Sequence, residues 1–137
     1  MSQENVELVR RICDLHRRKE FKKARKLVAR KMQFEMMDFS EVIWPLRQYA
    51  DVLGQMRDYL EAWEAFAYEY DEFVDVGPLQ VISVIHVAGR GKGGGTAIDR
   101  HFAEIWTIEK GKATQYRVYR SRAEGLMAAG LDPNRKP

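Results

Sequence analysis

Apolar residues in the first half of the chain recur at the spacing of a helix. Over residues 3–18 and 21–29 they return every three or four positions, and the longest stripe of this kind runs over residues 47–66. Such a period is typical of amphipathic α-helices that bury one face. Three helices are therefore predicted, interrupted by a short strand at 32–37, where apolar and polar residues alternate.

The second half of the chain alternates with a period of about two residues. Glycine-containing turns divide it into segments that predict strands over residues 68–76, 79–88, 97–109 and 113–120. Strands joined by short turns pair as an antiparallel meander. After them, Ser121 and Glu124 have the spacing of a capping box and predict a short last helix, which Gly130 ends.

This order of elements predicts a single α+β domain. At 137 residues the chain has the size of one domain with one core, over residues 1–131, followed by a flexible tail at 132–137. Helices and strands that are segregated along a chain pack in separate layers. We expect the apolar stripe of the longest helix to lie against one face of a curved sheet.

Composition narrows the partners and the compartment. Cys13 is the only cysteine, so neither an internal disulfide nor a cysteine-based zinc site can form. No apolar run approaches the roughly 18 residues that a membrane span needs, and the polar N-terminus is unlike a signal peptide. The basic excess is confined to residues 17–31, which argues against a nucleic-acid module. A cytoplasmic protein without membrane or nucleic-acid partners is predicted.

Several segments together resemble one known family. They are Ser2-Gln-Glu-Asn-Val-Glu-Leu-Val-Arg-Arg11, Leu60-Glu-Ala-Trp63, Phe102-Ala-Glu-Ile-Trp-Thr107 with Gly111-Lys112, and Arg117-Val-Tyr119 with Arg122-Ala-Glu-Gly-Leu126. This pattern covers nearly the whole chain and is similar to the SnoaL-like branch of the nuclear transport factor 2-like superfamily. The resemblance implies a cone-shaped barrel, in which a curved antiparallel β-sheet wraps around three N-terminal helices, with a short C-terminal helix. It also implies a pocket inside the cone and a homodimer formed through the sheet.

Two carboxyl groups are the candidate acid and base. The resemblance to ketosteroid isomerases of this fold implies a carboxylic acid at Glu104 and a proton-abstracting carboxylate at Glu35. Two carboxyls in one apolar cavity have their pKa values pushed apart, so that one donates and the other accepts a proton. The isomerase tyrosine of the first helix corresponds to Ile12 or Cys13 here, which leaves Tyr116 as the second donor. Strand alternation also allows Glu35 to face water instead.

The resemblance implies a pocket between the concave face of the sheet and the first and third helices. On that template, strand parity and these two helices give further pocket residues, because side chains two positions apart on a strand share a face. The predicted substrate-binding residues are Arg120, Arg100, Phe102, Trp106, Val118, Cys13, His16 and Trp63. An acid buried between Phe102 and Trp106 needs a partner, and we expect Arg120 or Arg100 to supply it. The sequence leaves open whether that pair is structural or faces a substrate.

The three histidines predict no metal site. His16 closes the apolar face of the first helix and is expected to be a core or rim histidine rather than a base. His86 and His101 lie on different strands, and none of the three shows the spacing of metal ligands. No metal and no cofactor are therefore predicted.

The sequence leaves two functions open. The leading one is a pocket for a small apolar molecule, in an isomerase or cyclase (lyase) type enzyme that moves a proton on a polyketide-, terpenoid- or steroid-like compound by general acid–base catalysis. The alternative is a non-catalytic ligand-binding or dimerisation module. A cavity of roughly 300 Å³ or more with an unpaired Glu104 favours chemistry. A homodimer is expected because Ile105 and Tyr119 would otherwise leave an apolar patch in water.

Overall fold

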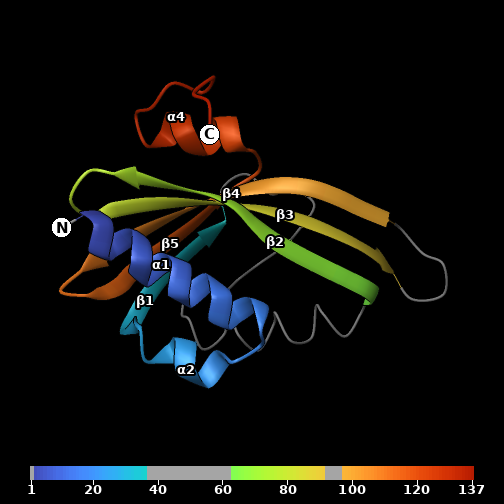
Figure 1. Ribbon diagram of the computed structural model, residues 1–137, viewed down its shortest axis with the longest axis horizontal. Coiled ribbons are helices and arrows are strands. Elements are labelled where there is room, and N and C mark those ends of the chain that lie inside the picture. The colour runs from blue at the N-terminus through green and yellow to red at the C-terminus, as the bar shows by residue number, and fades with distance from the viewer. Residues whose placement is uncertain (1, 37–62, 92–96) are drawn as a thin grey trace.

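The computed structural model describes residues 2–36, 63–91 and 97–137. Within these residues the fold is α+β, with one curved sheet that has α1 and α2 on one side and α4 on the other (Figure 1). The elements are α1 (Ser2–Arg17), α2 (Phe21–Arg25), β1 (Val28–Met36), β2 (Trp63–Val76), β3 (Gln80–Gly91), β4 (Ala97–Glu109), β5 (Lys112–Tyr119) and α4 (Arg122–Ala128). None of the helices in this described part is long and apolar enough to cross a membrane.

The sheet has the strand order β1-β5-β4-β3-β2. From β2 to β5 each strand pairs antiparallel with the next, which confirms the predicted meander. The prediction that the whole sheet is antiparallel is wrong, because β1 runs parallel to β5, with Phe34 opposite Tyr116. A parallel pair needs a long connection between its strands, and the chain from β1 to β5 supplies one.

Two predicted helix ends are also wrong. The second helix ends at Arg25, and Val28 already pairs with Ala113 at the start of β1. Of the helix predicted over 47–66, residues 47–62 lie outside the described residues, and Trp63 to Phe66 belong to β2. Two apolar residues, Trp63 and Phe66, are too few to distinguish a helix from a strand. Pairing with β3 decides for the strand.

The inner face of the sheet, on the side of α1, holds the larger core. Val9, Ile12 and Cys13 of α1 pack there against Trp106 and other strand residues. Trp106 and Ile12 are fully buried. Burial of such side chains contributes about 1.5–3 kcal/mol each, so this contact fixes α1 on the sheet.

The outer face of the sheet carries a second core beneath α4. Leu126 packs there against Ile82, Ile105 and other apolar residues, and Tyr119 lies at the edge of the cluster. Ile105 is 4% exposed. The premise of an open patch at Ile105 and Tyr119 is therefore wrong, because α4 of the same chain covers it, and the homodimer stays a prediction.

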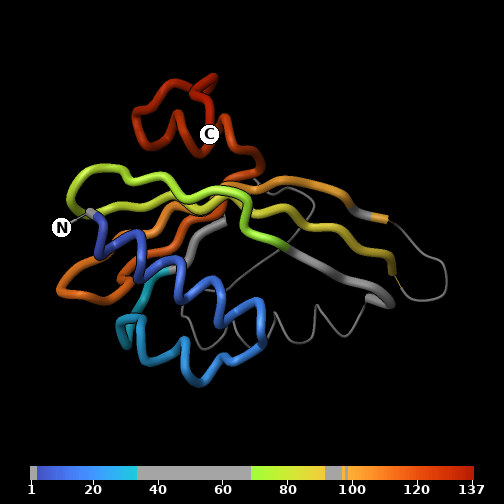
Figure 2. Tube along the Cα trace, viewed as in Figure 1, coloured from blue at the N-terminus to red at the C-terminus, as the bar shows by residue number. Residues whose placement is uncertain are grey.

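Helix α4 is attached to the sheet by specific contacts. Ser121 caps it as predicted, since its hydroxyl accepts a hydrogen bond of 3.2 Å from the Glu124 backbone N–H. Gly125 sits so close to Ala103 that an added Cβ would lie 2.4 Å from the Ala103 Cβ. Arg122 reaches β2, where its Nε donates to Glu72 over 2.8 Å. The last part of the chain therefore folds back over the outer face (Figure 2).

Candidate functional site

A buried polar network lies on the inner face around Glu104. This side chain is 4% exposed, as predicted for a residue between Phe102 and Trp106. The Ser83 hydroxyl donates to its Oε1 over 2.7 Å, and the Tyr116 hydroxyl donates to its Oε2. Trp106 Nε1 in turn donates to Ser83 Oγ over 2.9 Å. Each oxygen of the carboxyl group therefore has a hydroxyl partner.

The register of the sheet brings these groups together. Ser83 on β3 is directly opposite Glu104 on β4, so the two side chains leave the same face of the sheet. Tyr116 on β5 is opposite Trp106, and the two rings lie 4.3 Å apart between centroids. Val118 is the residue directly opposite Glu104, so the Tyr116 hydroxyl reaches the carboxyl group diagonally, from two residues away along β5.

Burial changes the acidity of Glu104. Loss of water around the carboxylate raises its pKa from 4.5 to about 7, although the hydroxyls of Tyr116 and Ser83 act in the opposite direction. A carboxyl group with this pKa exchanges its proton near neutral pH. It therefore meets the first requirement for a general acid or base.

The prediction that an arginine pairs with Glu104 is wrong. Among the described residues its carboxylate bonds two hydroxyls and no guanidinium. Arg120 instead lies on Glu124, with Nη2 3.1 Å from Oε1. Arg100 stacks over the ring of Phe102, with its Cζ 5.1 Å from the ring centroid. A carboxyl group that can stay protonated does not need a buried counter-charge, which removes the physical reason for the expected pair.

Helix α1 adds two more buried titratable groups. Cys13 is 1% exposed, and burial raises the pKa of its thiol well above the usual range, with the charge of Glu104 acting in the same direction. His16 is buried as a core histidine, with its ring 6.4 Å from that of Trp106. Burial lowers the pKa of His16 to about 4, so its ring is neutral at pH 7.

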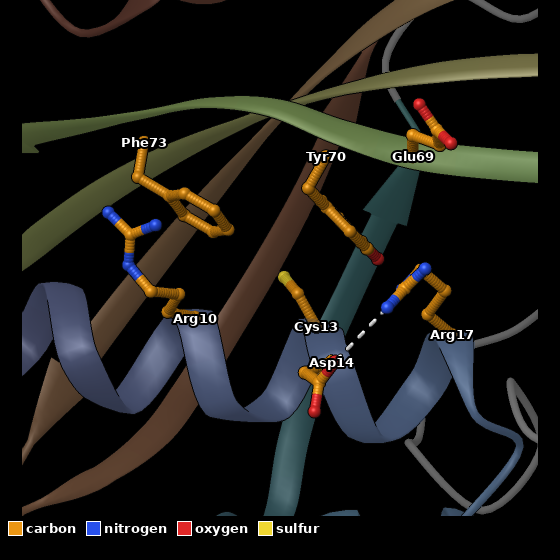
Figure 3. A pocket seen from close by; sticks show the side chains of 7 residues that line it. All are labelled: Arg10, Cys13, Asp14, Arg17, Glu69, Tyr70 and Phe73. Carbon is orange, nitrogen blue, oxygen red and sulfur yellow. Dashed lines mark ion pairs between the residues drawn. The ribbon is translucent and has the colours of Figure 1, made fainter.

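The described residues form a pocket of about 280 Å³ between α1 and β2 (Figure 3). Tyr70 and Phe73 form its aromatic wall, with ring centroids 6.0 Å apart, and Arg10 lies over the Phe73 ring at 4.6 Å. The full lining is Arg10, Cys13, Asp14, Arg17, Glu69, Tyr70 and Phe73. The Glu69 carboxylate points away from α1 on the far side of β2, and Arg17 pairs with Asp14 (Figure 3), which leaves the aromatic wall and Arg10 facing the cavity.

Cys13 connects the pocket to the buried network. It lines the pocket, and its thiol is within hydrogen-bonding reach of Tyr70 in the pocket and of Ser83 in the network, both of which lower its pKa against the effect of burial. Glu104 and Tyr116 are not part of this lining. The cavity is close to the smallest volume typical of ligand pockets, roughly 300 Å³, but Glu104 is paired. Of the two conditions that favour chemistry, the cavity volume is therefore nearly met, whereas an unpaired Glu104 is not.

The other predicted site residues lie as follows. Val118 is buried opposite Glu104, and Phe102 is half-buried on the same face. Glu35 on β1 is opposite Arg117, and Trp63 begins β2 opposite Gly91. The side chains of Glu35 and Trp63 lie outside those that the structure describes. Their roles, like that of His16, remain predictions.

Sequence reasoning missed most of the pocket. Of the lining, only Cys13 was among the predicted substrate-binding residues. Arg10, Asp14 and Arg17 share a helix face with Cys13, so this stripe beside the apolar one was readable in the sequence. Ser83 is a single hydroxyl within an apolar strand, which is also a visible signal. Their partners on β2 were hidden, because the sequence does not say which strand α1 covers.

Solved structures share this fold. An NTF2-like protein of unknown function from Burkholderia pseudomallei is 15% identical, with a TM-score of 0.70 over 90% of this chain and 95% of that one. AclR, a putative hydroxylase from Streptomyces galilaeus, is 16% identical, with a TM-score of 0.67 over 95% and 97%. A protein with a ketosteroid isomerase-like fold from Catenulispora acidiphila, in complex with trimethylamine, is 16% identical, with a TM-score of 0.57 over 82% and 83%. Neither a protein-family model nor a curated protein matches the sequence.

Proposed function

We propose that this chain, which has the nuclear transport factor 2-like fold, binds a small, largely apolar molecule in the pocket between α1 and β2. The observation that carries the proposal is the aromatic wall of Tyr70 and Phe73, which faces α1 across a cavity of about 280 Å³. A flat ring gains contact area and stacking against such a wall. The solved structure in complex with trimethylamine supports the idea that this fold accommodates small molecules.

Recovery of the natural ligand tests this proposal. The protein is isolated from its own host, and compounds that remain bound are identified by native mass spectrometry. We expect one apolar compound per chain, and Phe73→Ala should lose it because half of the aromatic wall is gone. Met127→Ala is the matched control, since Met127 is 55% exposed on α4 and far from the pocket wall.

A preparation that carries no compound is then titrated with flat polyketide-, terpenoid- and steroid-like molecules, followed by NMR of the protein. Shifts of Tyr70 and Phe73 signals that the Phe73→Ala variant lacks would support the pocket. Absence of binding by every compound would overturn the proposal and leave the non-catalytic dimerisation module.

A second candidate function, proton transfer of the isomerase or cyclase type, is favoured by the acidity of Glu104. A carboxyl group with a pKa of about 7 beside a tyrosine hydroxyl can pass a proton at neutral pH. In this reading the substrate extends from the pocket past Cys13 to Glu104, which is the acid, while Tyr116 is the second donor and Glu35 is the base. The test is turnover of the recovered compound: Glu104→Gln should abolish turnover but retain binding. Equal turnover in the variant would exclude Glu104 as the acid.

A further inference from the structure

Two histidines face each other on the outer side of the sheet. His86 on β3 is directly opposite His101 on β4, and their rings stack with centroids 4.4 Å apart and an angle of 7° between planes. Their side chains are 35% and 53% exposed, so both rings are open to solvent. These residues lie on the opposite side of the sheet from Glu104 and the pocket.

A bulge in β2 brings a carboxylate to the same place. The pairing of β2 with β3 shifts between Tyr70 and Glu72, which leaves Asp71 as the extra residue. A bulge of this kind redirects a side chain. Tyr70 lines the pocket on the inner side, whereas the Asp71 Oδ2 lies 3.2 Å from the His101 Nε2.

The three side chains converge closely enough to share one ion. One ligand atom from each of Asp71, His86 and His101 lies within 4.8 Å of the others. A fourth side chain, Asp99, holds His86, with its Oδ1 2.6 Å from Nε2. A tetrahedral metal ion with bonds of about 2.0–2.2 Å needs its ligand atoms roughly 3.3–3.6 Å apart, which small rotations of these exposed side chains can provide.

We propose that Asp71, His86 and His101 bind a borderline divalent metal ion such as Zn²⁺ on the outer face of the sheet. Two imidazoles and one carboxylate suit Zn²⁺, Cu²⁺ or Ni²⁺, whereas Mg²⁺ and Ca²⁺ prefer sites made of oxygen ligands alone. Asp99 is placed either to complete the coordination or to orient the His86 ring. Because the ligands come from β2, β3 and β4, the ion would join three strands.

Titration of the untagged protein with Zn²⁺ tests the site, with isothermal calorimetry as the readout. We expect one Zn²⁺ per chain and no binding of Mg²⁺. His101→Ala and Asp71→Asn should each weaken Zn²⁺ binding at least tenfold. Asp75→Asn is the matched control, because Asp75 is an exposed carboxylate on the same strand, and it should leave the affinity unchanged. The altered residues are exposed, so the variants should fold, and circular dichroism checks this.

Electron paramagnetic resonance of the Cu²⁺-loaded protein identifies the ligands. We expect coupling to the nitrogens of two imidazoles in the unaltered protein and of one in His101→Ala. The proposal is overturned if the unaltered protein binds no Zn²⁺, or if a double variant lacking His86 and His101 binds it equally well. Neither result would bear on the pocket, which is lined by different residues.

Discussion

The two faces of the sheet are built from the same strands, yet they bury different chemistry. Along β4, Glu104 points to the inner face and Ile105 to the outer face, and both are 4% exposed. The inner face also buries His16, Cys13 and Ser83. The outer core under α4 consists of apolar residues such as Ile82 and Leu126. One strand thus carries a hydrogen-bonded acid on one side and a plain hydrophobic contact on the other.

This difference shows where the molecule departs from what stability alone requires. Burying an acid costs free energy that an apolar side chain of similar size would not cost. The outer core reaches full burial without that cost. Among the buried groups, those that call for a function are therefore the polar ones of the inner face, and the outer core serves as an internal reference.

The largest expected effect lies on the outer face. Leu126→Ala should lower the free energy of unfolding by about 2–5 kcal/mol, because it leaves a cavity beneath α4. Urea unfolding measures the loss. Met127→Ala is the control and should stay within about 0.5 kcal/mol of the unaltered chain. A loss from Leu126→Ala as small as the control's would show that α4 does not hold the outer core.

The next prediction uses pH to separate the contributions of two buried groups of the inner face, Glu104 and His16, to the free energy of unfolding. The folded pKa of Glu104 is raised from 4.5 to about 7, so its contribution to stability is present below pH 4.5 and is lost as the pH rises through 7. The folded pKa of His16 is lowered from 6.5 to about 4, so its contribution is present above pH 6.5 and is lost as the pH falls through 4. The two dependences oppose each other in the unaltered protein.

Replacement of either group should expose the dependence of the other. Since a tenfold change in proton affinity corresponds to about 1.4 kcal/mol, the stability of Glu104→Gln relative to the unaltered chain should rise by about 3 kcal/mol between about pH 4 and pH 8. The relative stability of His16→Leu should rise instead as the pH falls. Urea unfolding across this pH range measures both. If Glu104→Gln and the unaltered chain have parallel pH profiles, Glu104 does not titrate near neutral pH.

The smallest effect concerns the ion pair that ties α4 to β2. The side chains of Arg122 and Glu72 are 24% and 13% exposed, between the surface and the interior. Arg122→Gln should therefore cost about 1–2 kcal/mol, more than an exposed pair and less than a buried one. Arg17→Gln, which breaks an ion pair with Asp14 whose side chains are 53% and 48% exposed, is the control.

Loosening α4 should also uncover the outer core, so Arg122→Gln is expected to associate more than the unaltered chain. Light scattering of both proteins measures this. The same measurement on the unaltered chain tests the predicted homodimer, and a strict monomer at micromolar concentration would remove that prediction. Equal association of the two proteins would indicate that the ion pair does not keep the outer face covered.

The sequence predicted the parts of the fold that depend on local pattern. Alternation along residues 97–109 placed Glu104 inside, and the spacing of Ser121 and Glu124 marked the start of α4, because both signals lie within a few residues of the feature they describe. Tyr116 was also identified as a donor near Glu104.

What the sequence could not show depends on register between strands. Whether Arg120 or Tyr116 reaches Glu104 is decided by which residues of β4 and β5 lie opposite each other, and one residue of slip reverses the faces. The same holds for His86 and His101, which are far apart in the sequence but directly paired in the sheet. The bulge at Asp71 has no local signal at all.

The pairing of β1 with β5 has a consequence for how the molecule is assembled. Strands β2 to β5 can form by successive hairpins between neighbours, but Val28 must find Ala113, which is 85 positions further along the chain (113 − 28). Closing so large a loop costs entropy before any contact repays it, so the N-terminal segment is expected to dock last. That segment carries Arg10, Cys13 and Asp14. A chain in which only the meander has formed therefore has only half of its pocket. A bound ligand would stabilise the docked N-terminal segment, because it contacts both halves.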